Sequence, residues 1–387
     1  MLRFLTAGES HGPAVTAILE GMPAGLPLGE EDIDRDLARR QKGFGSGGRM
    51  KIEKDRVQIL GGVMHGHTIG APICLQVSNR DHVKWQGKAV PPLTTPRPGH
   101  ADLTGAIKYG YRDLRFSLER ASARETTARV AAAAVCRKLL TEFGVSVDSY
   151  VTEIGSVTAD LSDVSIEERA ARADECDVRC PHPEVAEAMR AHIRETMEAK
   201  DTLGGVFEVV ALGVPPGLGS HVHWDRKIEG RLAQALLSIH AIKGVEVGPA
   251  FENARKPGTE VHDEIFLEGE QVTRRTNRAG GTEGGVTTGQ PLLLRAAMKP
   301  LSTTLNPLQT VDLANGETAP TTYERSDFCA VPRAAIVGEA MVAFVLADEL
   351  LRKLGGDSLT EIKPRFEALR AATLDDLPME AQEHVFW

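Results

Sequence analysis

The chain has 387 residues, of which 42% are hydrophobic and 26% charged, and its formal net charge is −9. These proportions are ordinary for a globular protein and exclude a disordered or collagen-like chain. An acidic chain with 5% aromatic residues is a poor candidate for a nucleic-acid binder, because such proteins are usually basic and stack bases on aromatic rings. No apolar run approaches the roughly 18 residues that a membrane span needs, and the N-terminus lacks a signal peptide's apolar region. We therefore expect a cytoplasmic protein.

Cysteine and glycine usage give further information on the kind of protein. The five cysteines are scattered and odd in number, which predicts reduced thiols rather than a disulfide framework. Cys176, Cys180 and His182 have a zinc-like spacing, but no second pair follows, so we expect no metal site. Glycine makes up 38 of the 387 residues, more than the usual share of about 7%. Such glycines are typical of places where backbone turns sharply or passes close to a ligand.

The predicted elements alternate irregularly along the chain. Short β-like runs lie at 2–6, 56–60, 72–77, 205–214 and 291–298. Helical periodicity lies at 123–140, 183–199, 227–242 and 334–354, the last apolar enough to be buried. Ser122 and Glu125 have the spacing of a capping box at the start of the first of these helices. The pattern predicts an α+β fold with antiparallel hairpins rather than a regular βαβ series.

Two histidines lie in loops that glycine and proline shape. His11 follows the first predicted strand in Gly8-Glu9-Ser10-His11-Gly12, and His100 lies in the segment 96–102, which holds two prolines and a glycine. Histidine titrates near neutrality, so either side chain could transfer protons. A turn histidine without a role is the alternative for each.

A glycine-rich segment at 43–49 lies between Arg40 and Arg49. It formally matches G-x-G-x-x-G, but a charged helical stretch precedes it instead of a strand, so the dinucleotide-binding context fails. We interpret it as a loop that could close over an anionic ligand, with a plain surface loop as the alternative. The stretch from 39 to 54 carries a net charge of +5 within an acidic chain, which indicates a local anion pocket.

Further anion-binding signals lie downstream. Arg120 and Arg124 lie at a helix start, where free N–H groups also favour phosphate. The run 276–285 holds four glycines in six positions, and Lys299 is followed by a hydroxyl cluster that ends at Thr303. Nucleotide-triphosphatase, zinc-protease and hydrolase motifs are missing. The residues alone therefore support a site for a polyanionic substrate and a phosphate-bearing cofactor, with histidine acid–base chemistry.

Seven segments together resemble one family, chorismate synthase. They are GESHG at 8–12, RPGHAD at 97–102, ERASARET at 119–126, KGVEVG at 243–248, TNRAGGTEGG at 276–285, AAMKPLST at 296–303 and RSDFCAVP at 325–332. They occur in the family's order and span most of the chain as one domain, 1–387. The tail after about residue 356 carries little of the resemblance.

The resemblance implies a fold and a reaction. The fold would be a sandwich, with a helical core between antiparallel sheets, and the assembly a homotetramer. The reaction would be the anti 1,4-elimination of phosphate from 5-enolpyruvylshikimate 3-phosphate to give chorismate, the last step of the shikimate pathway. The family needs reduced FMN although the reaction is redox-neutral. Whether the enzyme reduces its own flavin with NADPH or receives it reduced stays open. No nucleic acid or membrane partner is implied.

The resemblance also implies roles for individual residues. His11 would protonate the departing phosphate, His100 would stabilise the anionic reduced flavin, and Asp327 would help to relay the substrate proton. Substrate contacts would come from Ser10, Arg40, Arg49, Arg120 and Arg325. Cofactor contacts would come from Arg40, Arg120, Ala121, Ser122, His240, Ala241, Gly284, Lys299, Pro300, Leu301, Ser302, Thr303 and Arg325.

The chain departs from the family pattern at two positions. Ser46 stands where many relatives carry an arginine, and Lys42 or Arg49 could substitute for it. His240 stands where relatives often have glutamine, and both side chains can hydrogen-bond a flavin edge. Two rival functions remain, a flavin oxidoreductase with net hydride transfer and an RNA-binding protein that uses the glycine loop. Net NADPH consumption would reveal the first, and salt-dependent RNA retention the second.

Overall fold

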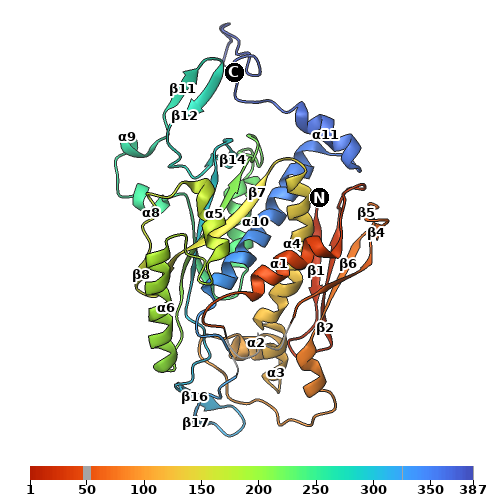
Figure 1. The fold of residues 1–387 in the computed structure, drawn as a ribbon, viewed down its shortest axis with the longest axis vertical. Helices are drawn as coiled ribbons and strands as arrows, with labels where there is room; N and C mark the ends of the chain where they lie inside the picture. Colours follow the sequence, from red (N-terminus) through yellow and green to blue (C-terminus); the bar gives the residue numbers. More distant parts are fainter. Residues whose placement is uncertain (47–53, 325, 387) are drawn as a thin grey trace.

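The structure, a computed structural model, describes residues 1–46, 54–324 and 326–386. Two antiparallel sheets enclose a layer of helices (Figure 1). The first sheet has the order β1-β2-β6-β3, with β1 at Arg3–Ala7, β2 at Ala14–Glu20, β6 at Ile73–Ser78 and β3 at Val57–Gly61. The second has the order β10-β15-β9-β7-β8, with β10 at Ile242–Val247, β15 at Leu292–Met298, β9 at Gly205–Leu212, β7 at Ser146–Ile154 and β8 at Val157–Thr158.

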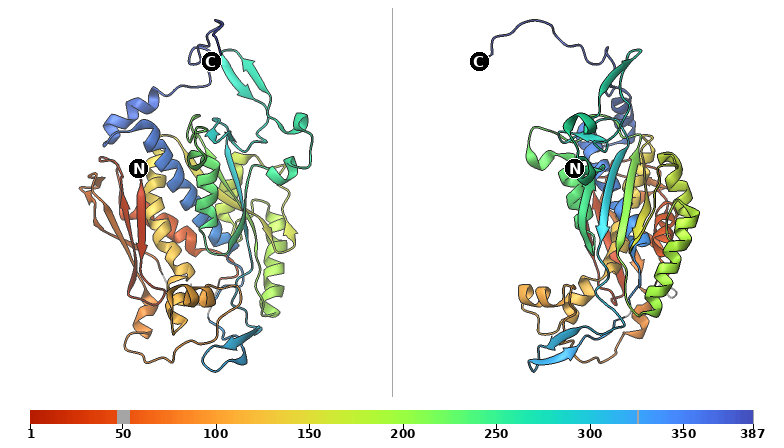
Figure 2. Two further views of the ribbon diagram at one scale, coloured as in Figure 1. Left: turned by 180° about the vertical axis from the view of Figure 1, so that it is seen from behind. Right: turned by 90° about the vertical axis from the view of Figure 1, so that its left-hand side faces the viewer.

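Four helices form the layer between the sheets: α1 at Glu30–Gln41, α4 at Thr126–Thr141, α7 at Ile228–Leu237 and α10 at Val331–Leu354. Helix α4 packs against β2 and β6 of the first sheet, and α10 packs against β7 and β9 of the second. The two helices also pack against each other along their length (Figure 2). The predicted sandwich with a helical core is therefore the observed architecture.

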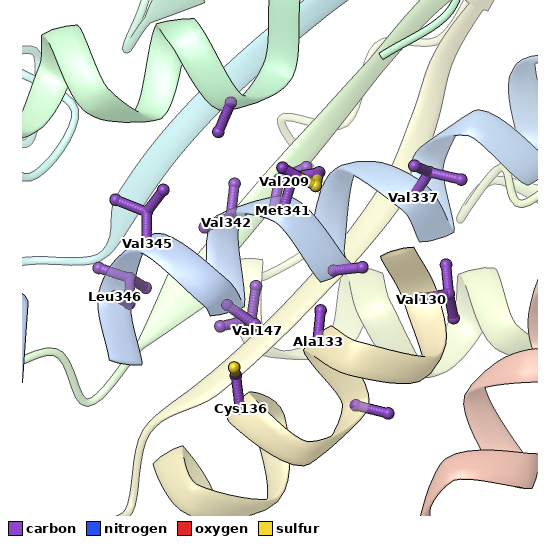
Figure 3. Close-up of a cluster of buried hydrophobic side chains, with 14 of the residues drawn as sticks. Val130, Ala133, Cys136, Val147, Val209, Val337, Met341, Val342, Val345 and Leu346 are labelled. Atoms are coloured by element: carbon purple, nitrogen blue, oxygen red, sulfur yellow. The ribbon is translucent and has the colours of Figure 1, made fainter. Parts of the chain in front are cut away.

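Small side chains allow this close packing. Residues Ala131 to Ala134 of α4 are buried, and Ala133 lies in one apolar cluster with Val342 of α10 and Val209 of β9 (Figure 3). Gly338 of α10 lies directly against the second sheet. A Cβ atom at Gly338 would lie only 2.6 Å from Cε2 of Phe207. Glycine at this position therefore sets how closely the helix approaches the sheet.

The remaining elements lie around the sandwich. Helix α5 (Ile166–Glu175) packs against β7, and α6 (Pro183–Glu198) packs against β8. One end of the molecule carries α2 (Asp102–Tyr109), α3 (Arg115–Arg120) and the hairpin of β16 (Gln309–Asp312) and β17 (Glu317–Pro320) (Figure 1). The other end carries α11 (Leu359–Glu367) and the hairpin of β11 (Ile265–Glu268) and β12 (Gln271–Arg274), which pairs with the C-terminal segment at Thr373.

The minor elements are short. They are β4 (Val63–Met64), β5 (His67–Thr68), β13 (Thr282–Glu283), β14 (Val286–Thr287), α8 (Ala250–Asn253), α9 (Gly258–Val261) and 3₁₀ turns at Arg80–Lys84, Ala123–Glu125 and Trp224–Arg226. Within the described residues, no helix is both long and apolar enough to cross a membrane.

The predicted strands all exist within one or two residues, but two helix predictions were wrong in detail. The helix predicted at 123–140 opens as a 3₁₀ turn, in which the Ser122 hydroxyl accepts from the backbone N–H of Arg124. Glu125 does not complete a capping box, because its carboxylate binds Thr6 and Arg129 instead. The helix predicted at 227–242 ends at Leu237, since the chain must turn there to enter β10.

Candidate active site

The turn between β1 and β2 holds His11 in a defined orientation. Gly8 opens this turn with a φ of 105°, and a Cβ there would lie 2.3 Å from the carbonyl oxygen of Ala14. The backbone N–H of Ser10 donates to the carbonyl of Glu119 at 3.0 Å. The Glu119 carboxylate then accepts from the backbone N–H of His11 at 2.8 Å and lies 2.7 Å from His11 Nδ1. The Trp85 ring packs against the imidazole, with 4.4 Å between ring centroids.

A buried polar chain supports this turn from below. The side-chain amide of Asn79 donates to the carbonyls of Gly12 at 2.8 Å and Glu9 at 3.2 Å. Arg124 donates from Nε to Asn79 Oδ1 at 2.6 Å and from Nη1 to the buried carboxylate of Asp55 at 2.6 Å. The sequence suggested Arg124 as an anion contact, but its side chain is buried and its hydrogen bonds stabilise the residues beneath the His11 turn.

Arg40 reaches the start of α4 from the end of α1. Its guanidinium donates to Thr126 Oγ1 at 2.8 Å and to the carbonyl of Ala123 at 2.9 Å, and it lies 3.6 Å from Asp55. Burial lowers the pKa of Arg40 to about 9, with Asp55 acting in the opposite direction. A buried cation that shares its carboxylate with Arg124 would gain from a bound anion.

Asp327 lies within electrostatic range of Arg40 and pairs with Arg333 at the start of α10. In the part of the chain that the structure describes, Nη1 of Arg333 is buried and has no hydrogen-bond partner. Among the described residues, the guanidinium groups of Arg40, Arg124 and Arg333 therefore act in one region with the carboxylates of Asp55 and Asp327. This excess of positive charge is what a polyanionic ligand needs. Arg49 and Arg325, predicted to bind substrate or cofactor, lie outside the described residues.

The second predicted histidine is held in the same manner as the first. Nδ1 of His100 lies 2.6 Å from Oδ1 of the buried Asp102. Arg97 donates to both oxygens of the same carboxylate, at 2.8 and 3.0 Å. Burial alone would raise the pKa of Asp102, but His100 and Arg97 outweigh it and hold that pKa well below its usual range.

The loop that carries His100 packs against the loop that follows β15. Arg97 donates from Nη1 to Thr303 Oγ1 at 3.2 Å. A Cβ at Gly99 would lie 3.5 Å from Lys299 Nζ and 3.6 Å from Ser302 Cβ, so the two loops touch there. The structure thus brings together the predicted segments 97–102 and 299–303, which are about 200 residues apart in sequence.

The predicted pair His240 and Ala241 joins this assembly. The backbone N–H of Lys299 donates to the Ala241 carbonyl at 3.0 Å. Ala241 has a φ of 65°, a conformation that non-glycine residues seldom adopt and that tends to cluster at functional sites. Burial lowers the pKa of His240 to about 4, although Glu125 acts in the opposite direction. Nδ1 of His240 is buried without a hydrogen-bond partner among the described residues.

Lys299 contributes a positive charge to the group formed by the His100 loop, the 299–303 loop and His240. Partial burial lowers the pKa of the Lys299 ammonium, and the nearby Lys243 adds to the effect. In the described ranges, the Lys299 ammonium donates only to the carbonyl of Pro300 and pairs with no carboxylate. Since no described carboxylate pairs with Lys299 or Lys243, the two ammonium groups can together bind a phosphate group. Leu301 and Pro300 contribute backbone to the same loop, and Thr202 donates to the Leu301 carbonyl at 2.8 Å.

The predicted trio Arg120, Ala121 and Ser122 lies beside the His11 turn. Arg120 donates to the carbonyls of Thr6 at 3.0 Å and Gly8 at 3.3 Å, and its side chain is exposed. The hydroxyls of Ser122 and Ser10 lie 3.0 Å apart. His240 connects this group to the other loops, because the charges of Glu125, His100 and Arg40 all act on it. Nearly all of the predicted residues that the structure describes therefore meet in one region.

Gly284 is the exception. It lies between β13 and β14 and borders a pocket of about 560 Å³ that Trp224 and Phe251 also line. The pocket touches β10 at Val245 and Val247, whereas Ala241 and Lys299 lie at the opposite end of that strand. At about 3.3 Å per strand residue, the two ends lie well over 10 Å apart. Within one chain, Gly284 does not belong to the cluster.

Sequence reasoning missed several residues of the site. Glu119 begins the segment 119–126, but its bond to His11 joins residues 108 positions apart, so the sequence did not reveal it. Arg97 and Asp102 are the first and last residues of the segment 97–102. They lie three residues before and two residues after His100, a spacing that could have suggested a local cluster. Trp85, Asn79 and Asp55 carry no sequence signal that marks them as site residues.

Comparisons with known proteins show the family to which the chain belongs. The family model for chorismate synthase matches residues 2–351. The chain belongs to the chorismate synthase family. A chorismate synthase from Aquifex aeolicus (strain VF5) is 55% identical over 384 residues, covering 95% of this chain and 96% of that protein. One from Chlorobaculum tepidum is 52% identical over 390 residues, covering 96% and 98%.

A solved structure is similar as well. "Crystal Structure of Chorismate Synthase" matches with a TM-score of 0.79 and 48% identity, covering 95% of this chain and 96% of that one. The family and the α+β fold class expected from the sequence motifs are therefore confirmed.

Proposed function

We propose that the protein is a chorismate synthase, a carbon–oxygen lyase that eliminates phosphate from 5-enolpyruvylshikimate 3-phosphate in the presence of reduced FMN. The observation that carries the proposal is the convergence of two carboxylate-held histidines with cations that, among the described residues, lack a full set of counterions. His11 and His100 supply the proton chemistry, and Arg40 and Lys299 supply the positive charge.

The histidines act through the ring nitrogen that their carboxylates leave free. His11 protonates the departing phosphate, because a phosphate leaves more readily once its charge is neutralised. His100 stabilises negative charge on the reduced flavin. Asp327 helps to relay the ring proton that is lost, and its pairing with Arg333 keeps a carboxylate beside the cationic region.

The anion contacts divide between the substrate and the cofactor. Arg40, Arg120 and Ser10 hold the substrate's carboxylates and phosphate, together with Arg49 and Arg325, which lie outside the described residues. Each buried charge-assisted contact contributes about 1.5–3 kcal/mol. Ser46 hydrogen-bonds the carbonyl of Gly43 at 2.6 Å, so it closes its own loop rather than replacing a guanidinium.

The residues present fit a reduced flavin. Nδ1 of His240, which has no partner among the described residues, offers a hydrogen bond to a ring edge. The 299–303 loop offers hydroxyls and an ammonium, and Ser122 offers a hydroxyl. Ala121 and Ala241 place small side chains where a flat ring could approach backbone. These residues would hold reduced FMN, which, when bound, would provide transient electron donation for the elimination.

We also propose that the enzyme is a cytoplasmic homotetramer, in which Gly284 contacts the flavin site of a neighbouring protomer. Gly284 lies near the end of β10 that is opposite to Ala241 and Lys299 of its own chain. Trp224 and Phe251 line the same pocket as Gly284, and they are 79% and 67% exposed to solvent. Large apolar side chains exposed together are typical of a surface that a partner covers. The five cysteines are free thiols, which fits a reducing compartment.

The test is an anaerobic assay with dithionite-reduced FMN, in which chorismate absorbance and released phosphate are followed together. The proposal expects equal amounts of both products, many turnovers per flavin and no net flavin oxidation. Oxidised FMN serves as the control and should give no product. Folded protein that binds FMN but makes no chorismate would overturn the proposal.

A second arm addresses the source of reduced flavin and the oxidoreductase alternative. The dithionite is omitted and NADPH is added. Chorismate formation under these conditions would mean that the enzyme reduces its own flavin. NADPH consumption in proportion to product would instead indicate net hydride transfer and favour the oxidoreductase.

A further inference from the structure

Glu119 makes three contacts with two consecutive residues of the His11 turn. Its carbonyl accepts from the N–H of Ser10 at 3.0 Å, one carboxylate oxygen accepts from the N–H of His11 at 2.8 Å, and the other lies 2.7 Å from His11 Nδ1. The side chains of Glu119 and His11 are 15% and 14% exposed, so water competes little for these bonds. One residue of α3 thus fixes both the backbone position and the ring orientation of His11.

The carboxylate is held in its ionised form. Burial acts to raise the pKa of Glu119, but the hydrogen bonds from the His11 ring and backbone and the nearby Arg115 outweigh it and lower that pKa. An ionised carboxylate can only accept hydrogen bonds. Nδ1 of His11 must therefore carry the proton that it shares with Glu119, whatever the state of Nε2.

The rest of the surroundings leave Nε2 available. The Trp85 ring covers one face of the imidazole, and the His82 ring hydrogen-bonds the His11 carbonyl at 2.9 Å rather than the ring. Asn79 binds carbonyls of the turn and does not contact the imidazole. Within the described residues, Nε2 has no hydrogen-bond partner, so its role is left to a ligand.

We propose that Glu119 is a positioning residue for His11, which keeps the His11 proton on Nδ1 and directs Nε2 toward the departing phosphate. This inference rests on the proposed function, because it assumes that His11 is the acid. It differs from the His100 pair, in which Arg97 also binds the carboxylate. Among the described residues, no arginine hydrogen-bonds the Glu119 carboxylate, and Arg115 acts on it only through space.

The first test is a double-mutant cycle on kcat. Glu119→Gln keeps the shape of the side chain but replaces one acceptor oxygen by a donor, which favours the opposite tautomer of His11. We expect kcat to fall about 10- to 100-fold, the range found when the hydrogen-bond partner that orients a metal-ligating histidine is removed, with flavin and substrate affinities unchanged. In a His11→Ala background, adding Glu119→Gln should cause no further loss, because the residue through which it acts is gone.

An equal loss in both backgrounds would overturn the proposal, because Glu119 would then act independently of His11. Full activity of Glu119→Gln would overturn it as well. The matched control is Glu187→Gln, which removes an exposed carboxylate that pairs with Arg190 on the surface of α6 and should leave kcat unchanged. If Glu119→Gln fails to fold, Glu119→Asp serves in its place, since the shorter side chain cannot keep both bonds to His11.

A second readout does not depend on turnover. Nitrogen-15 NMR of histidine-labelled protein distinguishes the two imidazole tautomers, and the His11 signals are those that disappear in His11→Ala. We expect a protonated Nδ1 in the native protein and a change of the signals in Glu119→Gln. Identical signals in both proteins would overturn the inference. If the native enzyme made no chorismate, the proposed function would fail while this measurement still tested the tautomer.

Discussion

The carboxylate of Asp102 binds two partners of the same loop at once: His100 Nδ1 at 2.6 Å and the Arg97 side chain at 2.8 Å from its Nε. The imidazole and the guanidinium are thereby fixed relative to each other, and Arg97 carries the connection onward to Thr303. The orientation of His100 and the position of the 299–303 loop therefore depend on one buried carboxylate.

Asp102→Asn should impair flavin binding and turnover together. The amide of the variant offers Arg97 one acceptor oxygen in place of two and cannot neutralise its charge, so both loops lose their alignment. We expect at least a 10-fold weaker affinity for reduced FMN, comparable to the loss of one charge-assisted hydrogen bond. Flavin titration by fluorescence or absorbance measures it. Asp177→Asn, which alters an exposed pair with Arg190, is the control, and native flavin affinity in Asp102→Asn would contradict the prediction.

His11→Ala should reduce kcat by about 100-fold or more, because general acid catalysis typically contributes that much. Substrate affinity should change little, since the proposed anion contacts come from arginines rather than from His11. Single-turnover measurement of phosphate release separates chemistry from binding. His384→Ala, at the exposed C-terminal end, provides a matched histidine control. An active His11→Ala enzyme would remove the basis for its assignment as the acid.

Glu339 should be a major determinant of acid stability. It is buried in α10 and accepts hydrogen bonds from Arg39 and Arg137 at 2.6 and 2.9 Å. Burial would raise the pKa of Glu339, but the attraction of its arginine partners, Arg179 included, outweighs it and lowers that pKa. The stabilisation is therefore complete above the ordinary glutamate value of about 4.3 and is lost as the pH falls through the lowered pKa.

Glu339→Gln should lower the free energy of unfolding at pH 7 by about 3–5 kcal/mol, because it leaves buried arginines without their shared carboxylate. Urea unfolding at pH 7 and at successively lower pH measures the effect. The difference between native and variant proteins should shrink as the pH falls below about 4. A pH-independent difference would mean that the charge of Glu339 is not the cause.

Gly338→Ala should destabilise the fold by about 1–3 kcal/mol, the usual effect of forcing a methyl group into a packed core. The added Cβ would lie 2.6 Å from Phe207 and 3.1 Å from Val209, so α10 or the sheet must shift. Gly230 of α7 is the matched control, since a Cβ there meets nothing within 4 Å. Gly230→Ala should instead stabilise by up to about 1 kcal/mol through helix propensity. Equal effects in urea unfolding would show that packing is not responsible.

The five cysteines should differ in reactivity toward thiol reagents. Burial raises the pKa of Cys180 to about 11 and of Cys329 to about 12, and it also raises the pKa of Cys136. Cys74 and Cys176 are only partly buried. At pH 8, the native protein should therefore label at these two thiols first, while the other three react only after unfolding. Peptide mapping identifies the sites, and fast labelling of Cys136 would contradict the assignment.

Much of the fold could be predicted because its signals are local. The run at 291–298 predicted β15 within one residue, since apolar β-formers specify a strand wherever it is placed. The apolar stretch at 334–354 predicted the buried helix α10, which begins three residues earlier at Val331. Sheet order and the pairing of α4 with α10 were not accessible in this way, because they depend on contacts between distant segments.

The sequence by itself determined which chemistry the protein carries: two histidines in glycine-shaped turns, a set of arginines and lysines, and the ordered motifs of one family. Residue type and short spacing suffice for that. Only the tertiary structure decided which charges are paired. In the folded protein, Arg124 hydrogen-bonds Asn79 and Asp55, and Glu119 hydrogen-bonds His11. Gly284 lies apart from the other predicted contacts. The physical reason is that these relationships arise where two sheets and a helical layer close around each other, and packing alone brings such distant residues together.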